Sequence, residues 1–211
     1  MSFQDFVSTD VALEKYALTR RDEEIVDYSQ IQPILPSDVL MHSLKFDLQH
    51  HPQILSEYAL CERIIYPILR EIWMRHAKLE IWSHIPIQVD EELSGVPDYL
   101  IARKSPRGFQ RLEIPILAIV EAKREDFITG WGQCLAAMVA ARKLNSELEL
   151  LPVIYGMVTS GRIWEFGQLE NQVVTIHPIN LSLAQLELLL GVLDYLFAKC
   201  EAQLAKIDYR E

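Results

Sequence analysis

Two short acidic motifs carry most of the chemistry that this sequence suggests. The first is Gly95-Val96-Pro97-Asp98, and the second is Glu121-Ala122-Lys123, which directly follows an apolar run at residues 116–120. The nearly continuous apolar composition of residues 114–122 predicts a buried central strand. Side chains alternate along a strand, so Glu121 and Lys123 leave the same face while Ala122 packs on the other.

The spacing of the motifs predicts that their carboxylates meet. Residues 96–102 and 114–122 are expected to form an antiparallel hairpin with its turn at residues 108–110, which sets Asp98 opposite Glu121. Two neighbouring carboxylates repel unless a cation lies between them. Mg²⁺ or Mn²⁺ suits such a site, with oxygen ligands from Asp98, Glu121 and the Ala122 backbone carbonyl. Lys123 would orient a water molecule and offset charge on a reacting phosphate.

Each motif also has a simpler interpretation. A Glu-x-Lys at a strand end is typically a surface pair, and an aspartate before a tyrosine is typically a turn residue. Their predicted adjacency, together with the buried strand that leads into Glu121, favours a functional site over two unrelated features.

The order of these motifs resembles the PD-(D/E)XK signature of restriction-endonuclease-like nucleases. In addition, Ser56-Glu57 followed by residues 63–69 is similar to a helix in the N-terminal domains of type I restriction enzyme R subunits. The resemblance implies a restriction-endonuclease-like fold and a metal-dependent phosphodiesterase centre. It also implies a third acid on this helix, which we expect to be Glu57, with Glu62 as the alternative; Glu57 would help to bind the metal directly or through a water molecule.

The resemblance extends beyond the lysine. Gln133 occupies the place where such proteins often carry a glutamine, and it would support Lys123 or contact a phosphate. Many relatives then carry a tyrosine, where this chain has Ala137. Residues 152–166 look like the strand–turn–strand that follows in these domains, so the resemblance covers residues 56–166.

The hydrophobic pattern predicts an α/β fold in which helices flank a mixed β-sheet. We expect an N-terminal helical arm at 1–50, a restriction-endonuclease-like core at 51–180, and a C-terminal helix at 181–211 that is capped by Ser182. That helix is expected either to pack on its own core or to form a homodimer interface. The pattern predicts helices at 37–48, 56–76 (kinked or divided at Pro67) and 129–144, and strands at 81–89, 96–102, 114–122, 153–158, 162–166 and 172–176, the last an edge strand.

The charge balance limits how this protein can bind nucleic acid. The 211 residues carry a net charge of −10, with 20 basic and 30 acidic side chains. We therefore expect weak, salt-sensitive, metal-dependent DNA binding that relies on a basic accessory protein, rather than coating by bulk charge. Residues 103–111 hold four cations and no acid, and both a phosphate contact and a solvated hairpin tip remain open for them.

These features together define the expected function and location. We expect a Mg²⁺-dependent enzyme that hydrolyses DNA phosphodiester bonds; a non-catalytic regulatory or interaction protein that keeps the nuclease fold is the alternative, and an RNA substrate is a weaker third option. The start of the chain has no secretory signal, no apolar run is long enough to span a membrane, and the three cysteines are widely separated. We expect a cytoplasmic protein with buried, reduced thiols.

Overall fold

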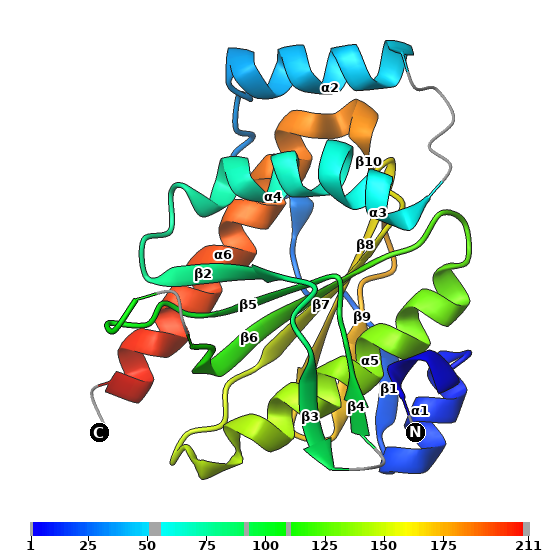
Figure 1. The fold of residues 1–211 in the computed structure, drawn as a ribbon, viewed down its shortest axis with the longest axis vertical. Coiled ribbons are helices and arrows are strands. Elements are labelled where there is room, and N and C mark those ends of the chain that lie inside the picture. Colours follow the sequence, from blue (N-terminus) through cyan, green and yellow to red (C-terminus); the bar gives the residue numbers. More distant parts are fainter. Residues whose placement is uncertain (1, 51–55, 91–92, 109–110, 209–211) are drawn as a thin grey trace.

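The computed structural model of the chain describes residues 2–50, 56–90, 93–108 and 111–208 (Figure 1). It is a mixed α/β fold, as predicted. Its helices are α1 (Thr9–Tyr16), α2 (Asp38–His50), α3 (Glu57–Leu60), α4 (Tyr66–Trp73), α5 (Phe127–Leu144) and α6 (Leu186–Asp208). Its strands are β1 (Thr19–Asp22), β2 (Leu79–Ser83), β3 (Ile87–Asp90), β4 (Leu93–Gly95), β5 (Tyr99–Arg103), β6 (Glu113–Ala122), β7 (Ile154–Thr159), β8 (Ile163–Glu170), β9 (Val173–Ile176) and β10 (Leu181–Ser182).

The main sheet runs in the order β1-β9-β8-β7-β6-β5-β2, and β10 pairs with β8. The sheet is mixed, because β6 and β7 pair in parallel, as do β1 and β9, while the other pairs are antiparallel. The parallel step from β6 to β7 is made through α5, the usual helical crossover. The strands β3 and β4 form a separate hairpin.

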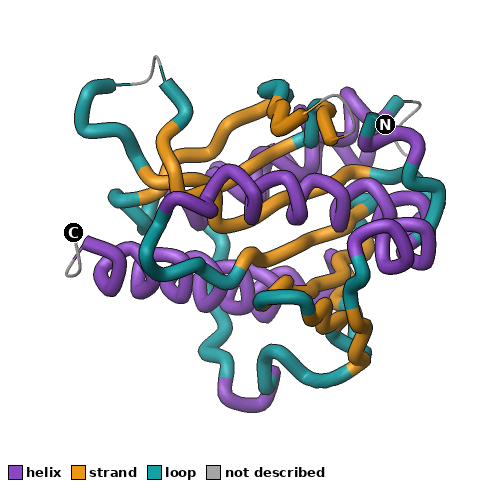
Figure 2. Tube along the Cα trace, turned by 90° about the horizontal axis from the view of Figure 1, so that it is seen from below, coloured by secondary structure: helices purple, strands orange, loops and turns teal. Residues whose placement is uncertain are grey.

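The sheet separates two hydrophobic cores. Tyr99 and Val120 lie in the core shared with α4 and α6, whereas Leu100 and Ile119 lie in the core shared with α5. This division follows from the alternation of side chains along a strand. Figure 2 shows the long C-terminal helix running beside the strands. Ten residues of α6 are buried, so much of this helix is covered within its own chain.

The predicted strand 81–89 is wrong as a single element. The chain forms β2 and β3 instead, and it turns between them at His84, whose φ is 52°. Pro86 lacks the backbone N–H that a central strand needs, which explains the break. Similarly, the strand predicted at 96–102 begins only at Tyr99, after Pro97, so Asp98 directly precedes β5.

The N-terminal region also departs from its prediction. Within the stretch predicted to be helical, β1 (Thr19–Asp22) adds a parallel strand to β9. The strand expected at the edge, 172–176, is therefore an interior strand. The four residues of β1 are exposed and polar, so their alternation gives no hydrophobic signal.

The helix predicted over 56–76 is divided, as expected, although by a π-helical turn. Cys61–Ile65 form this turn between α3 and α4, and Pro67 lies in the first turn of α4. Proline is tolerated there because the first helical N–H groups have no partner within the helix. The three segments stay continuous across the top of the sheet (Figure 1).

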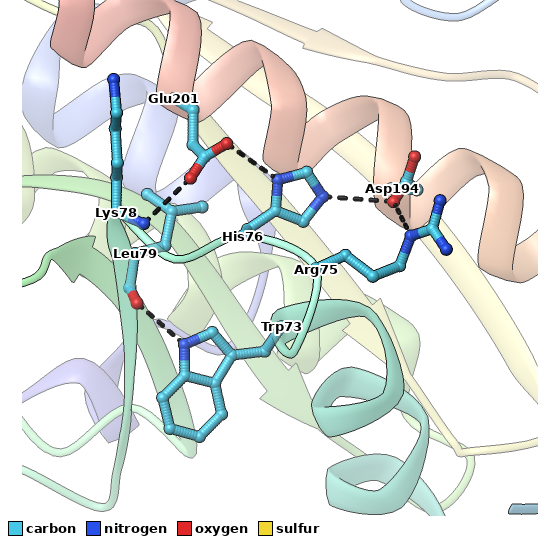
Figure 3. A network of polar contacts seen from close by, with 7 residues as sticks. All are labelled: Trp73, Arg75, His76, Lys78, Leu79, Asp194 and Glu201. Carbon is cyan, nitrogen blue, oxygen red and sulfur yellow. Dashed lines mark hydrogen bonds and ion pairs between the residues drawn. The ribbon is translucent and has the colours of Figure 1, made fainter.

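A polar network joins the turn after α4 to the C-terminal helix (Figure 3). We define the His76 network as Arg75, His76, Asp194 and Glu201. The buried His76 ring lies between two carboxylates, with Nε2 3.2 Å from Asp194 and Nδ1 3.2 Å from Glu201. Arg75 also binds Asp194, at 2.7 Å. Each nitrogen of the ring therefore faces a carboxylate oxygen within hydrogen-bond distance.

The described part of the chain contains no helix that could cross a membrane. None of the helices there combines the length and the apolar character needed to span a bilayer.

Candidate active site

The predicted pairing of the two acidic motifs matches the observed register. The β5–β6 ladder ends with Tyr99 opposite Val120, so Asp98 and Glu121 are the next residue on each side of its last pair, and Asp98 Oδ2 accepts from the Ala122 N–H. The register shifts only at the other end of β5, between Ile101 and Arg103. We define the acidic cluster as Glu57, Asp98, Glu121 and Lys123.

Lys123 connects the acids of this cluster. Its Nζ lies 3.2 Å from Glu121 Oε1 and 3.4 Å from Glu57 Oε2. Its backbone N–H donates to the Thr159 carbonyl at 2.9 Å, which fixes the chain just beyond β6. Burial alone would lower the pKa of the Lys123 ammonium, but the carboxylates around it together raise the pKa.

Glu57 reaches the cluster from the helix above the sheet. It is the first residue of α3, and the Ser56 side chain caps that helix by accepting from the Ala59 N–H at 3.1 Å. The alternative acid, Glu62, lies exposed on the π-helical turn and makes no ion pair with Lys123. Among the two candidates, the structure therefore brings Glu57 to the lysine.

Asp98 is held by the backbone on both sides. Its Oδ2 accepts from the Ala122 N–H at 2.7 Å, and its own carbonyl accepts from the His84 N–H at 2.9 Å. Burial raises the pKa of Asp98, while the Ala122 hydrogen bond and the charge of Lys123 act in the opposite direction. The backbone therefore fixes the position of Asp98, although these favourable contacts do not fully cancel the effect of burial on its pKa.

Glu121 is the most buried acid of the cluster. Burial, and then the nearby charge of Asp98, raise its pKa to about 8, although Lys123 opposes this shift. The cluster therefore carries more buried negative charge than one lysine can offset. The donor set fits a hard divalent cation, for which the ligands would be Asp98, Glu121 and the Ala122 carbonyl.

Gln133 lies on α5, the helix that follows the lysine, as expected, and its contact with a phosphate stays a prediction. It is buried on α5, and within the described part of the chain it forms no hydrogen bond with Lys123. The same helix does approach the lysine closely at Gly130, where a Cβ would lie only 2.9 Å from Lys123 Cγ and 2.6 Å from Val158 Cγ1. Glycine at this position allows α5 to pack against the lysine.

Sequence reasoning missed two side chains beside Asp98. The Nε2 atom of His84 lies 3.3 Å from Asp98 Oδ1, and the buried thiol of Cys61 is close to the same carboxylate. A regular strand over 81–89 would put His84 on the same face as Trp82. Pro86 is the signal that could have revealed the turn that redirects His84.

The basic stretch lies at the far end of β5. Arg103 closes that strand and binds Asp208 at 2.7 Å, so one of the four cations serves the C-terminal helix. Arg107 and Arg111 are exposed, while Phe109 and Gln110 lie outside the described residues. Arg103 lies five residue steps beyond Asp98, so at about 3.3 Å per residue the loop starts about 16 Å from Asp98.

The three cysteines are buried and free, as expected. Burial, followed by the charge of Asp98, raises the pKa of the Cys61 thiol to about 12.

No protein-family model matches the chain, and a comparison with curated proteins finds no match.

Proposed function

We propose that this chain is a metal-dependent nuclease that hydrolyses DNA phosphodiester bonds at a PD-(D/E)XK site on a restriction-endonuclease-like core. The observation that carries the proposal is that Asp98 and Glu121 flank the last β5–β6 pair, Tyr99 and Val120, with Asp98 bound to the Ala122 N–H and Lys123 bound to Glu121. The antiparallel β5–β6 pair, followed by α5 and the parallel strand β7, supports the assignment of this core.

Each residue has a distinct task in this proposal. Asp98, Glu121 and the Ala122 carbonyl would hold Mg²⁺ or Mn²⁺, and backbone hydrogen bonds orient Asp98 before the ion binds. The bound ion would supply Lewis acidity toward the phosphate and a more acidic water.

Lys123 would position the attacking water and donate to the phosphate as negative charge develops. Glu57 is a positioning residue, since it lies 3.4 Å from Nζ and limits where the ammonium can go. DNA is proposed as the substrate on the basis of the motif resemblance, and the net charge of −10 implies that binding weakens steeply with salt.

The test combines metal binding with cleavage. Wild type, Asp98→Asn and the control Asp22→Asn, whose side chain lies on the exposed edge strand β1, are titrated with Mg²⁺ and Mn²⁺ by calorimetry. Each protein is then incubated with single-stranded, duplex and supercoiled DNA and with RNA. We expect metal binding at millimolar or lower concentration and DNA cleavage in wild type and Asp22→Asn, with both lost in Asp98→Asn.

Failure of wild type to bind either ion in the presence of DNA would refute the proposal. Cleavage that persists in Asp98→Asn would identify a contaminating nuclease. Metal binding without cleavage would favour a non-catalytic protein that keeps the site, and cleavage of RNA alone would correct the substrate class.

A further inference from the structure

We propose that Cys61, His84 and Asp98 form a second metal site, for a transition-metal ion of the zinc or cobalt class. One ligand atom from each of these residues lies within 4.8 Å of the other two. The site shares Asp98 with the acidic cluster, so its effect on catalysis rests on the proposed function. Its ability to bind metal does not.

The three ligands come from separate elements and are all held in place. Cys61 begins the π-helical turn, His84 lies in the turn after β2, and Asp98 directly precedes β5. π-Helical turns are rare and occur frequently at functional sites. The Cys61 side chain is fully buried and is free of any disulfide.

His84 presents a nitrogen toward the other two ligands. Its Nδ1 lies 2.8 Å from Ser83 Oγ, while the buried Nε2 faces Asp98 Oδ1 at 3.3 Å without forming a hydrogen bond with any residue that the structure describes. The tautomer with hydrogen on Nδ1 donates to Ser83 and leaves the Nε2 lone pair free. This arrangement is usual for metal-binding histidines, whose second nitrogen is fixed by a hydrogen bond.

The surroundings of His84 hold the ring in this orientation. The Tyr58 ring is 5.2 Å away and the Tyr99 ring is 5.9 Å away, both between centroids. The backbone of His84 has a φ of 52°, a conformation that is uncommon for residues other than glycine. Such backbone conformations concentrate at functional sites, because the surrounding fold must maintain them.

The donor set determines which metals fit. A thiolate, an imidazole and a carboxylate suit zinc or cobalt, whereas Mg²⁺ binds oxygen ligands. Ligands bound to one tetrahedral zinc are separated by about 3.3–3.8 Å, so the side chains need to close by roughly 1 Å from the upper limit observed here. Binding transfers the Cys61 thiol proton to the solvent, and the fourth coordination position stays open.

Because both sites need Asp98, occupation of one removes a ligand from the other. Zinc is therefore expected to inhibit cleavage that is supported by Mg²⁺. This competition would let the chain respond to transition-metal concentration through a residue, Cys61, that the Mg²⁺ site does not need.

The test uses cobalt as a spectroscopic probe of the thiolate. The full chain, kept reduced, is titrated with Co²⁺, and the near-ultraviolet charge-transfer band of a cobalt–thiolate bond is recorded. We expect the band in wild type and in Cys200→Ser, a matched variant of another buried cysteine, but not in Cys61→Ser. His84→Ala should weaken Co²⁺ binding at least tenfold. Circular dichroism of each variant verifies folding.

The outcomes distinguish this site from the proposed nuclease. Glu121→Gln should keep the cobalt band, because Glu121 is not one of the three ligands. A band in a wild-type protein that shows no cleavage would support the metal site while refuting the nuclease. Lack of the band in wild type, its persistence in Cys61→Ser, or normal affinity in His84→Ala would overturn the inference.

Discussion

The His76 network and the acidic cluster both gather charged side chains in the described part of the chain, and they are built differently. In the His76 network, two carboxylates face an imidazole, an arginine and the Lys78 backbone N–H. In the acidic cluster, Lys123 forms ion pairs with two of the three carboxylates, Glu121 and the more exposed Glu57. The network carboxylates keep about a quarter of their side-chain surface exposed, at 28% and 26%, compared with 16% for Asp98 and 9% for Glu121.

This difference separates a structural from a functional arrangement of charge. Matched donors and acceptors at a partly solvated position can join two helices at modest cost. In the acidic cluster, burial raises the pKa of both Asp98 and Glu121, and for Glu121 the nearby charge of Asp98 adds to the rise, so holding both acids ionised lowers the stability of the chain. Perturbed groups of this kind concentrate at functional sites.

Replacing the lysine of the acidic cluster should have the largest effect. Lys123→Met removes the donor expected to stabilise charge on the phosphate, so the cleavage rate should fall by about 100-fold or more. The rate is measured under single-turnover conditions with saturating Mg²⁺. A loss of less than about threefold would show that Lys123 does not serve catalysis.

Replacing His76 should have the opposite result, because it should lower stability and leave cleavage nearly unchanged. His76→Ala leaves Asp194 and Glu201 without their shared partner, and we expect a loss of about 2 kcal/mol in the free energy of unfolding, reduced from fully buried cases because both acids are partly exposed. Cleavage per folded molecule should stay within twofold of wild type. Urea denaturation measures the first quantity, and an unchanged midpoint would contradict the structural role.

The two helix acids provide a finer test of the acidic cluster. Glu57→Gln should slow cleavage about tenfold, because it loosens the position of the Lys123 ammonium. Glu62→Gln serves as the matched variant and should stay within twofold, since that side chain is exposed on the π-helical turn. If the two effects were reversed, Glu62 would be the acid that supports the site.

The smallest effect concerns stability and pH. The pKa of Glu121 is raised from 4.5 to about 8, so the folded chain holds a proton that the unfolded chain releases, and the free energy of unfolding should fall as pH rises through this range. Glu121→Gln removes that dependence and should stabilise the metal-free protein by about 1 kcal/mol at pH 8. Lys123 loses a partner, which limits the gain.

Denaturation in a chelator at pH 6 and pH 8 measures this difference. The control is Glu201→Gln, in the His76 network, which should lower stability rather than raise it. A Glu121→Gln variant that is less stable than wild type at pH 8 would show that Lys123 fully balances the glutamate.

Local pattern was sufficient to predict the centre of the site. The alternation of residues 114–122 put Glu121 and Lys123 on one face, and hairpin pairing brought Asp98 beside Glu121. The prediction succeeded because a hairpin joins strands that are close in sequence, so its register depends on nearby residues. The divided helix near Pro67 and the long C-terminal helix were predicted for the same reason.

The errors arose where distant segments decide the outcome. The strand β1 is polar and gains its place only by pairing with β9, more than 150 residues later. His84 turns toward Asp98 because the chain leaves the sheet before Pro86. A single-residue change of direction alters every side chain that follows, and periodicity alone does not locate it.

The sequence by itself determined that this chain forms an α/β fold in which two acidic motifs converge on Lys123. Only the tertiary structure decided what surrounds them. Cys61 and Glu57 reach the same strand end because a helix packs across the sheet, and that packing depends on burial of apolar surface from many segments at once. Local spacing was enough to predict that Asp98 and Glu121 are neighbours, whereas the residues that surround these two acids depend on the whole fold.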